Sequence, residues 1–364
     1  MKKTVFLISI MGLLWATSLH AQELIPYRKG DKWGFCTPDK KVVIQPKYDF
    51  ARLFSEGLAW VKLNGKWGLI DRTGKEIIPP KYNFVDSYSE GLAGVRLDDK
   101  WSFIDKTGKE VLLLKYLSVS SFSCGLASVN MNNKFGFINK NGQEIVPPKY
   151  EEVGNFLEGV AKVKLNGKWG IIDTTGKEII APKYNDMRDC SEGMIAVSLN
   201  DKWGFLNKAG KEIIPLKYDD ADVFSDGLAK VAKGSLSEQK WGYIDKTGKE
   251  VIPIKYNSAE NFSEGIAIVR EGDLCSAINK TGKLIVPAKY HTISNFSGGI
   301  AMVSLYYKKG FIDKTGKEIV PTKYEAIIED FNNGLAKWVF NDYEDSFYYI
   351  KVFPNGKIIE YYDD

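Results

Sequence analysis

The chain has 364 residues, of which 44% are hydrophobic, 13% aromatic and 26% charged. Lys2 and Lys3 lie in a segment that we expect to be cleaved. Without these two, the chain has 48 basic and 46 acidic residues, which gives a net charge of +2. This balance, with no long basic run, excludes the electrostatic footprint of a nucleic-acid-binding protein.

Residues 1–21 have the three parts of a secretory signal peptide. Lys2 and Lys3 form the positive region, residues 5–19 the apolar region, and Leu19-His20-Ala21 a cleavage site before Gln22. No later stretch reaches the roughly 18 apolar residues that a membrane-spanning helix needs. We therefore predict an exported protein, periplasmic or secreted, with no membrane span after signal removal.

From residue 22 to residue 364 the sequence repeats a single unit, which is clearest at residues 64–82. The spacing is 34 residues, except for 38 before the seventh copy and 40 before the tenth. A fixed period of this size indicates a repeat architecture. We therefore predict ten tandem units that form one continuous array. The tryptophan position of the unit is occupied in turn by Trp33, Trp67, Trp101, Phe135, Trp169, Trp203, Trp241, Cys275, Lys309 and Tyr349.

Two turns define the unit. Asn64-Gly65 between apolar runs predicts a type I′ hairpin, and residues 71–74, with Asp first and Gly last, predict a type I turn. The segments around them read as three short strands, which tight turns make antiparallel. We expect the third strand to stop at Pro79-Pro80, because proline cannot donate to a β-ladder. The glycine that follows the tryptophan position, replaced by Ser102, Ser276 and Ile350 in three copies, is expected to let another group lie close across the strand.

These units predict an all-β fold of tandem three-stranded antiparallel meanders. A single meander of this length cannot bury its own apolar face, so neighbouring units must stack. We favour an open or superhelical array, since propellers usually close with about 4–8 blades. One or two closed β-propellers are the alternative.

Two further motifs recur between the meanders: Lys-Tyr after the third strand, and Phe-Ser-Glu-Gly before the next unit. Their structural interpretation is that Tyr and Phe clamp the connector onto the sheet while Gly takes a strained backbone angle. Their functional interpretation is a repeated face that stacks on sugars or pairs with acidic groups. This candidate binding face comprises Lys81, Tyr82, Lys149, Tyr150, Lys183, Tyr184, Lys217 and Tyr218.

No arrangement of residues typical of catalysis or metal binding stands out. His291 is the one histidine after the leader, and it lies in a connector. The chain contains none of the usual nucleophile, zinc or phosphate-binding motifs. We therefore predict no catalytic, metal-binding or cofactor-binding residues and no cofactor. The cysteines, which fall in non-adjacent units and predict free, mostly buried thiols rather than disulfides, are Cys36, Cys124, Cys190 and Cys275.

The repeated Lys-Trp-Gly-Phe-Ile-Asp-Lys-x-Gly-Lys-Glu-Ile-Ile-Pro-Pro-Lys-Tyr pattern, followed by Phe-Ser-Glu-Gly-Leu-Ala-x-Val, resembles the WG-repeat (KWG-repeat) family of bacterial proteins along the whole mature chain. The resemblance implies a β-rich, often exported scaffold or interaction module without a defined catalytic site. We thus predict a non-catalytic scaffold that binds a protein or a cell-envelope glycan. The alternative is a glycan-active enzyme that uses the recurring carboxylates Glu56, Glu90, Glu158, Glu192 and Glu264.

Overall fold

The computed structural model describes residues 24–113, 116–235, 237–324, 326–332, 335–340, 347–352 and 358–361. The predicted signal peptide lies outside these ranges. Within them the secondary structure consists of strands, which form ten sheets with antiparallel pairing throughout. We number the sheets 1 to 10 in chain order. The all-β repeat fold predicted from the sequence is confirmed.

Sheet 1 has three strands and each of the other nine has four, in the order of the chain. The first strands are β4 (Phe50–Ala51), β8 (Phe84–Val85), β12 (Ser118–Val119), β16 (Glu152–Val153), β20 (Asp186–Met187), β24 (Asp220–Ser225), β28 (Ser258–Ala259), β32 (Thr292–Ile293) and β36 (Ala326–Asn332). The second strands are β1 (Ile25–Lys29), β5 (Leu58–Leu63), β9 (Leu92–Leu97), β13 (Leu126–Met131), β17 (Val160–Leu165), β21 (Met194–Leu199), β25 (Leu228–Lys233), β29 (Ile266–Arg270), β33 (Ile300–Leu305) and β37 (Leu335–Phe340).

The third and fourth strands complete each sheet. The third strands are β2 (Lys32–Cys36), β6 (Lys66–Asp71), β10 (Lys100–Asp105), β14 (Lys134–Asn139), β18 (Lys168–Asp173), β22 (Lys202–Asn207), β26 (Lys240–Ile244), β30 (Cys275–Asn279), β34 (Lys308–Asp313) and β38 (Phe347–Val352). The fourth strands are β3 (Val42–Tyr48), β7 (Glu76–Tyr82), β11 (Glu110–Leu113), β15 (Glu144–Tyr150), β19 (Glu178–Tyr184), β23 (Glu212–Tyr218), β27 (Glu250–Tyr256), β31 (Leu284–Tyr290), β35 (Glu318–Tyr324) and β39 (Ile358–Tyr361).

The last three strands of each sheet are the predicted meander, and the first strand comes from the connector, where the sequence predicted none. The expected strand end at the prolines is also wrong, because β7 continues through Pro79 and Pro80 to Tyr82. The prolines fit because β7 is an edge strand of its sheet, where a missing N–H leaves no ladder bond unmade.

The glycine after each tryptophan has the structural role that the sequence predicted. In sheet 5, Trp169 pairs with Tyr184 and Ile171 with Ile180, so Gly170 alone faces residues 181–183 of β19. A Cβ atom on Gly170 would lie 2.4 Å from the carbonyl oxygen of Ile180. The backbone of the fourth strand therefore bulges directly over the glycine.

The core lies between consecutive sheets. One buried cluster combines Trp203 and Phe205 of sheet 6 with Phe224 and Val231 of sheet 7, and similar clusters join other neighbours along the array. This confirms that stacking of units is what buries their apolar faces.

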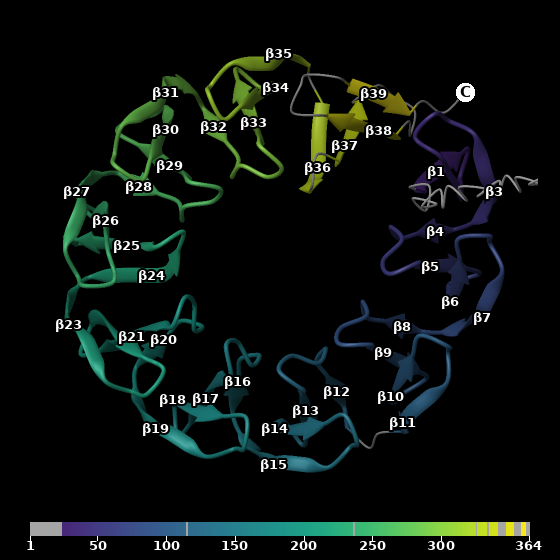
Figure 1. Ribbon diagram of the computed structural model, residues 1–364, viewed down its shortest axis with the longest axis horizontal. Helices are drawn as coiled ribbons and strands as arrows, with labels where there is room; N and C mark the ends of the chain where they lie inside the picture. The colour runs from purple at the N-terminus through teal and green to yellow at the C-terminus, as the bar shows by residue number, and fades with distance from the viewer. Residues whose placement is uncertain are drawn as a thin grey trace, which may run out of the picture.

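Figure 1 shows the ten sheets following one another around a central opening, with the long fourth strands such as β15, β19 and β23 at the outer rim. Sheet 1 lacks the first, connector-derived strand that the other sheets have, and within the described residues no strand pairing joins sheet 1 to sheet 10. The sheets are separate units that follow one another as an open repeat array, as predicted, and this array is bent into a ring (Figure 1).

Candidate functional site

The recurring Ser-Glu-Gly segment, or its variant, forms a tight turn at the inner end of sheets 2 to 9. In sheet 3, Ser89 pairs with Leu92 across a two-residue turn, in which Glu90 has a φ of +51° and Gly91 a φ of +87°. The turn between β24 and β25, at Asp226-Gly227, points toward the central opening (Figure 1). A glutamate at positive φ is uncommon and strained, and the strain recurs at Glu56, Glu158, Glu192 and Glu264.

Contacts to the next sheet account for this strain. The Glu90 carboxylate accepts a hydrogen bond from the N–H of Gly125 at 3.0 Å and pairs with the Lys140 ammonium at 3.1 Å, both in sheet 4. The Ser89 hydroxyl donates to the carbonyl of Phe122 at 2.6 Å. We call this set of contacts the inner joint. The same acid–lysine pair recurs as Glu56–Lys106, Glu158–Lys208, Glu192–Lys246 and Glu264–Lys314.

The inner joint that follows sheet 4 lacks both charges. Between sheets 4 and 5, Cys124 takes the glutamate position with a φ of +52°, and Thr174 takes the lysine position. All four cysteines are free thiols, and Cys124 is the exposed one. Burial raises the pKa of the Cys36 and Cys190 thiols to about 11, which keeps them protonated and unreactive near neutral pH.

The predicted Lys-Tyr face is a second set of contacts between sheets, which we call the outer joint. Tyr82 and Tyr150 are fully buried, and the Tyr82 hydroxyl donates to Glu110 of the next sheet at 3.3 Å. The Lys81 ammonium lies 4.7 Å from the centre of the Tyr82 ring and 4.0 Å from the Glu110 carboxylate.

These contacts agree with the structural interpretation of the Lys-Tyr motif rather than with the functional one. The rings of Tyr82, Tyr150, Tyr184 and Tyr218 are buried, so they cannot form an exposed stacking ladder. Their positions at the ends of the fourth strands make them packing residues between sheets. The exposed part of the predicted face consists of the lysines Lys81, Lys149, Lys183 and Lys217.

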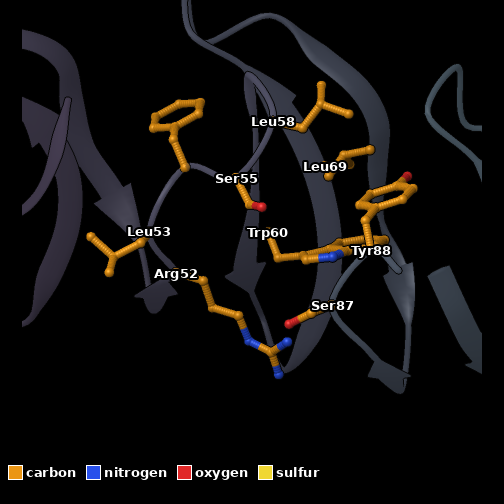
Figure 2. Close-up of a pocket in the computed structure, with 9 residues that line it drawn as sticks. Arg52, Leu53, Ser55, Leu58, Trp60, Leu69, Ser87 and Tyr88 are labelled. Carbon is orange, nitrogen blue, oxygen red and sulfur yellow. The ribbon is translucent and has the colours of Figure 1, made fainter. Parts of the chain in front are cut away.

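A pocket lies between sheets 2 and 3, where the residues depart from the repeat (Figure 2). Its volume is about 230 Å³, and its wall includes Arg52, Trp60 and Tyr88. The indole of Trp60 and the ring of Tyr88 are stacked, with centroids 6.1 Å apart. Within the described part of the chain, the buried Nε1 of Trp60 makes no hydrogen bond. A small hydrogen-bond acceptor in this pocket would satisfy it.

The electrostatics of this pocket are mixed. Burial lowers the pKa of the Arg52 guanidinium, whose carbon lies 4.6 Å from the centre of the Trp67 ring. Burial also raises the pKa of Asp86, while the charge of Arg52 lowers it. Asp86 lies outside the pocket wall, in which Arg52 is the charged residue.

A second group of departures from the repeat lies in sheets 8 and 9. Cys275 and Lys309 replace the tryptophan there, and a cavity of about 180 Å³ opens beside the buried Cys275. The guanidinium of Arg270 donates to Cys275 Sγ at 3.0 Å and to the carbonyl of His291 at 2.9 Å.

His291 also caps the neighbouring hairpin. Its Nδ1 accepts a hydrogen bond from the N–H of Tyr306 at 3.3 Å. Asp49, Asn83 and Asn185 occupy the corresponding position in other units, and their side-chain oxygens accept from the equivalent turns. His291 therefore has the same structural role as the Asp or Asn that occupies this position in other units.

Among the described residues, no group of three or more His, Cys, Asp or Glu side chains is arranged to hold a metal ion. Nor does any helix in that part of the chain have the length and apolarity to cross a membrane.

The model of the "WG containing repeat" family matches nine segments: 33–67, 67–101, 101–135, 135–169, 169–203, 203–236, 241–275, 277–308 and 310–342. None of the curated proteins matches the chain.

Among solved structures, one entitled "Crystal structure of the eukaryotic initiation factor" is similar with a TM-score of 0.53 and 13% identity, over 82% of this chain and 94% of that one. Kluyvelomyces marxianus Hsv2 is similar with a TM-score of 0.39 and 12% identity, over 66% of this chain and 94% of that one. At such identities the likeness concerns the fold alone.

Proposed function

The chain belongs to the family of WG-containing repeat proteins, and we propose that it is an exported, non-catalytic scaffold that binds a protein or a cell-envelope glycan. The observation that carries this proposal is that the recurring polar residues contact neighbouring sheets. In the inner joint Glu90 contacts Gly125 and Lys140, and in the outer joint Tyr82 contacts Glu110. The repeat therefore maintains the ring, and a partner is recognised by residues that differ between units.

The enzyme alternative relies on the same carboxylates. Glycoside hydrolysis needs one pair of carboxyl groups with different protonation, held on either side of a substrate. Glu192 instead accepts from the Gly227 N–H at 3.0 Å and pairs with Lys246 at 3.0 Å. The equivalent acid Glu264 is held in the same way, and its ion pair with Lys314 lowers its pKa. Such contacts favour a structural role.

The test uses the mature protein, residues 22–364, as bait on envelope extract from the producing cells. One portion of extract is digested with protease and another with glycan-degrading enzymes. The digestion that abolishes binding identifies the class of partner. We expect specific retention of a protein or a glycan and no release of reducing ends from envelope glycan. Release of reducing ends by the wild-type protein that disappears in Glu192→Gln would instead establish the enzyme.

Export is tested separately. Amino-terminal sequencing of the protein recovered from the periplasm or medium should begin near Gln22. Recovery from the cytosol with Met1 intact would contradict this part of the proposal.

A further inference from the structure

The hairpin turn between β33 and β34 carries Tyr306 and Tyr307, and we propose that these two rings are a binding site for sugar units of a cell-envelope glycan. This inference rests on the proposed binding role of the scaffold and gives it a location and a ligand class.

Exposure separates this pair from the other aromatic residues. Tyr306 is 75% exposed and Tyr307 is 95% exposed, whereas the recurring Tyr82, Tyr150 and Tyr290 are buried. Tyr307 thus contributes almost nothing to the core, and packing does not explain its presence. Singly scattered apolar residues are normal on a protein surface, whereas adjacent exposed rings such as these form a patch that can serve as an interaction site.

The backbone gives independent evidence. Tyr306 has a φ of +46° and Tyr307 a φ of +66°. A type I′ turn requires positive φ at both central positions, and the same turn is made by Asn64-Gly65 in sheet 2 and Asn166-Gly167 in sheet 5. Bulky side chains are rare in this region because they are strained there. Two tyrosines therefore occupy a turn in which Asn-Gly would be more stable, and such strain is concentrated at functional sites.

The surroundings of the pair are polar. The His291 ring lies edge-on to Tyr306, with centroids 5.1 Å apart. The hydroxyls of Thr292 and Ser304, 2.6 Å apart, lie on the adjacent strands of the same sheet. Two aromatic rings on the hairpin turn, with an imidazole and two hydroxyls from elsewhere in the same unit, are a combination that only this unit has.

This combination fits a sugar. The face of an aromatic ring is negative, so it attracts the C–H groups on one face of a pyranose. The ring hydroxyls of the sugar then point outward, where hydroxyl and imidazole groups can bond to them. A protein partner would instead favour aromatic residues set in a desolvated, apolar centre. The chemistry around Tyr306 therefore favours carbohydrate over protein.

The test is cosedimentation of the mature protein with purified, protease-treated peptidoglycan sacculi, with soluble fragments of the same glycan as competitor. The decisive variant is Tyr306→Asn with Tyr307→Gly, which installs the turn that sheets 2 and 5 already use. We expect binding to weaken about tenfold, the loss typical of an exposed aromatic stacking contact. We also expect the midpoint of thermal unfolding to stay the same or rise, because the turn strain is relieved. The matched control, Asp201→Gly, relieves the equivalent turn of sheet 6, and its binding should be unchanged.

Each other result overturns the inference. Wild-type binding retained in the double variant would place the sugar site elsewhere. Failure of the wild type to bind sacculi, with an envelope protein captured through Tyr306 and Tyr307, would make the turn a protein-docking site and leave the proposed scaffold function intact. Failure to bind any envelope component would reject both proposals.

Discussion

The tryptophan position offers the sharpest test of how the array is held together. Trp169 is 9% exposed and belongs to a cluster that includes Ile180 of its own sheet and Met187 of sheet 6. The ammonium groups of Lys162 and Lys164 lie 5.3 and 5.4 Å from the centre of the indole. Replacing Trp169 with alanine removes both the packing between sheets 5 and 6 and these two contacts.

The size of the effect follows from the buried area. A tryptophan buries about 200 Å², and at about 25 cal/mol per Å² this amounts to about 4.5 kcal/mol for an almost completely buried ring. A compact unfolded chain lowers such values by roughly 10–40%. We therefore expect Trp169→Ala to destabilise its surroundings by about 3–4 kcal/mol, within the range found for large aromatic residues lost from cores.

Hydrogen exchange resolved by peptide is the appropriate measurement, because a repeat array need not unfold in a single step. Coupling between repeats is mainly to nearest neighbours, so protection should fall across sheets 5 and 6, within residues 130–230, and stay unchanged at both ends. Trp241→Ala, at a half-buried indole, is the matched control and should have a smaller effect. Unchanged protection around Trp169 would refute a core role and would support an exposed stacking surface instead.

Two further predictions concern the joints. Installing the missing acid–lysine pair with Cys124→Glu and Thr174→Lys should stabilise the contact between sheets 4 and 5 by about 0.5–1 kcal/mol relative to the sum of the single variants. A double-mutant cycle of local hydrogen exchange measures this coupling, and additive single effects would show that the joint is not ionic. Burial raises the pKa of Tyr82 from the ordinary tyrosine value of 10.0 to about 12, so its neutral form is favoured in the folded state. The stability it contributes is complete below pH 10 and is lost as the pH rises toward 12. Tyr82→Phe should make alkaline unfolding, followed by circular dichroism, less steep, and an identical profile would contradict this assignment.

Features that depend only on neighbouring residues could be predicted from the amino-acid sequence. Residues 64–65 and 71–74 form the predicted turns, and the Asp71 carboxylate accepts from the Thr73 N–H at 2.8 Å, as expected of a turn that begins with Asp. The glycine after tryptophan was also correctly interpreted, because the lack of a side chain in a strand has few causes. Because the pattern recurs along the chain, each of these predictions could be checked against several copies of the unit.

The contacts between one unit and the next could not be predicted without the folded arrangement of the sheets. Ser89 contacts Phe122, 33 residues away, and the Lys140 ammonium contacts the Glu90 carbonyl, 50 residues away. Such pairs depend on the angle between successive sheets, which no local pattern encodes. For this reason Tyr82 was taken for a candidate surface residue, although it is buried between sheets, and Tyr306 was not singled out. The exposure and strained φ of Tyr306 arise from its place in the folded hairpin. The sequence alone shows only that tyrosine replaces the usual turn residue at this position.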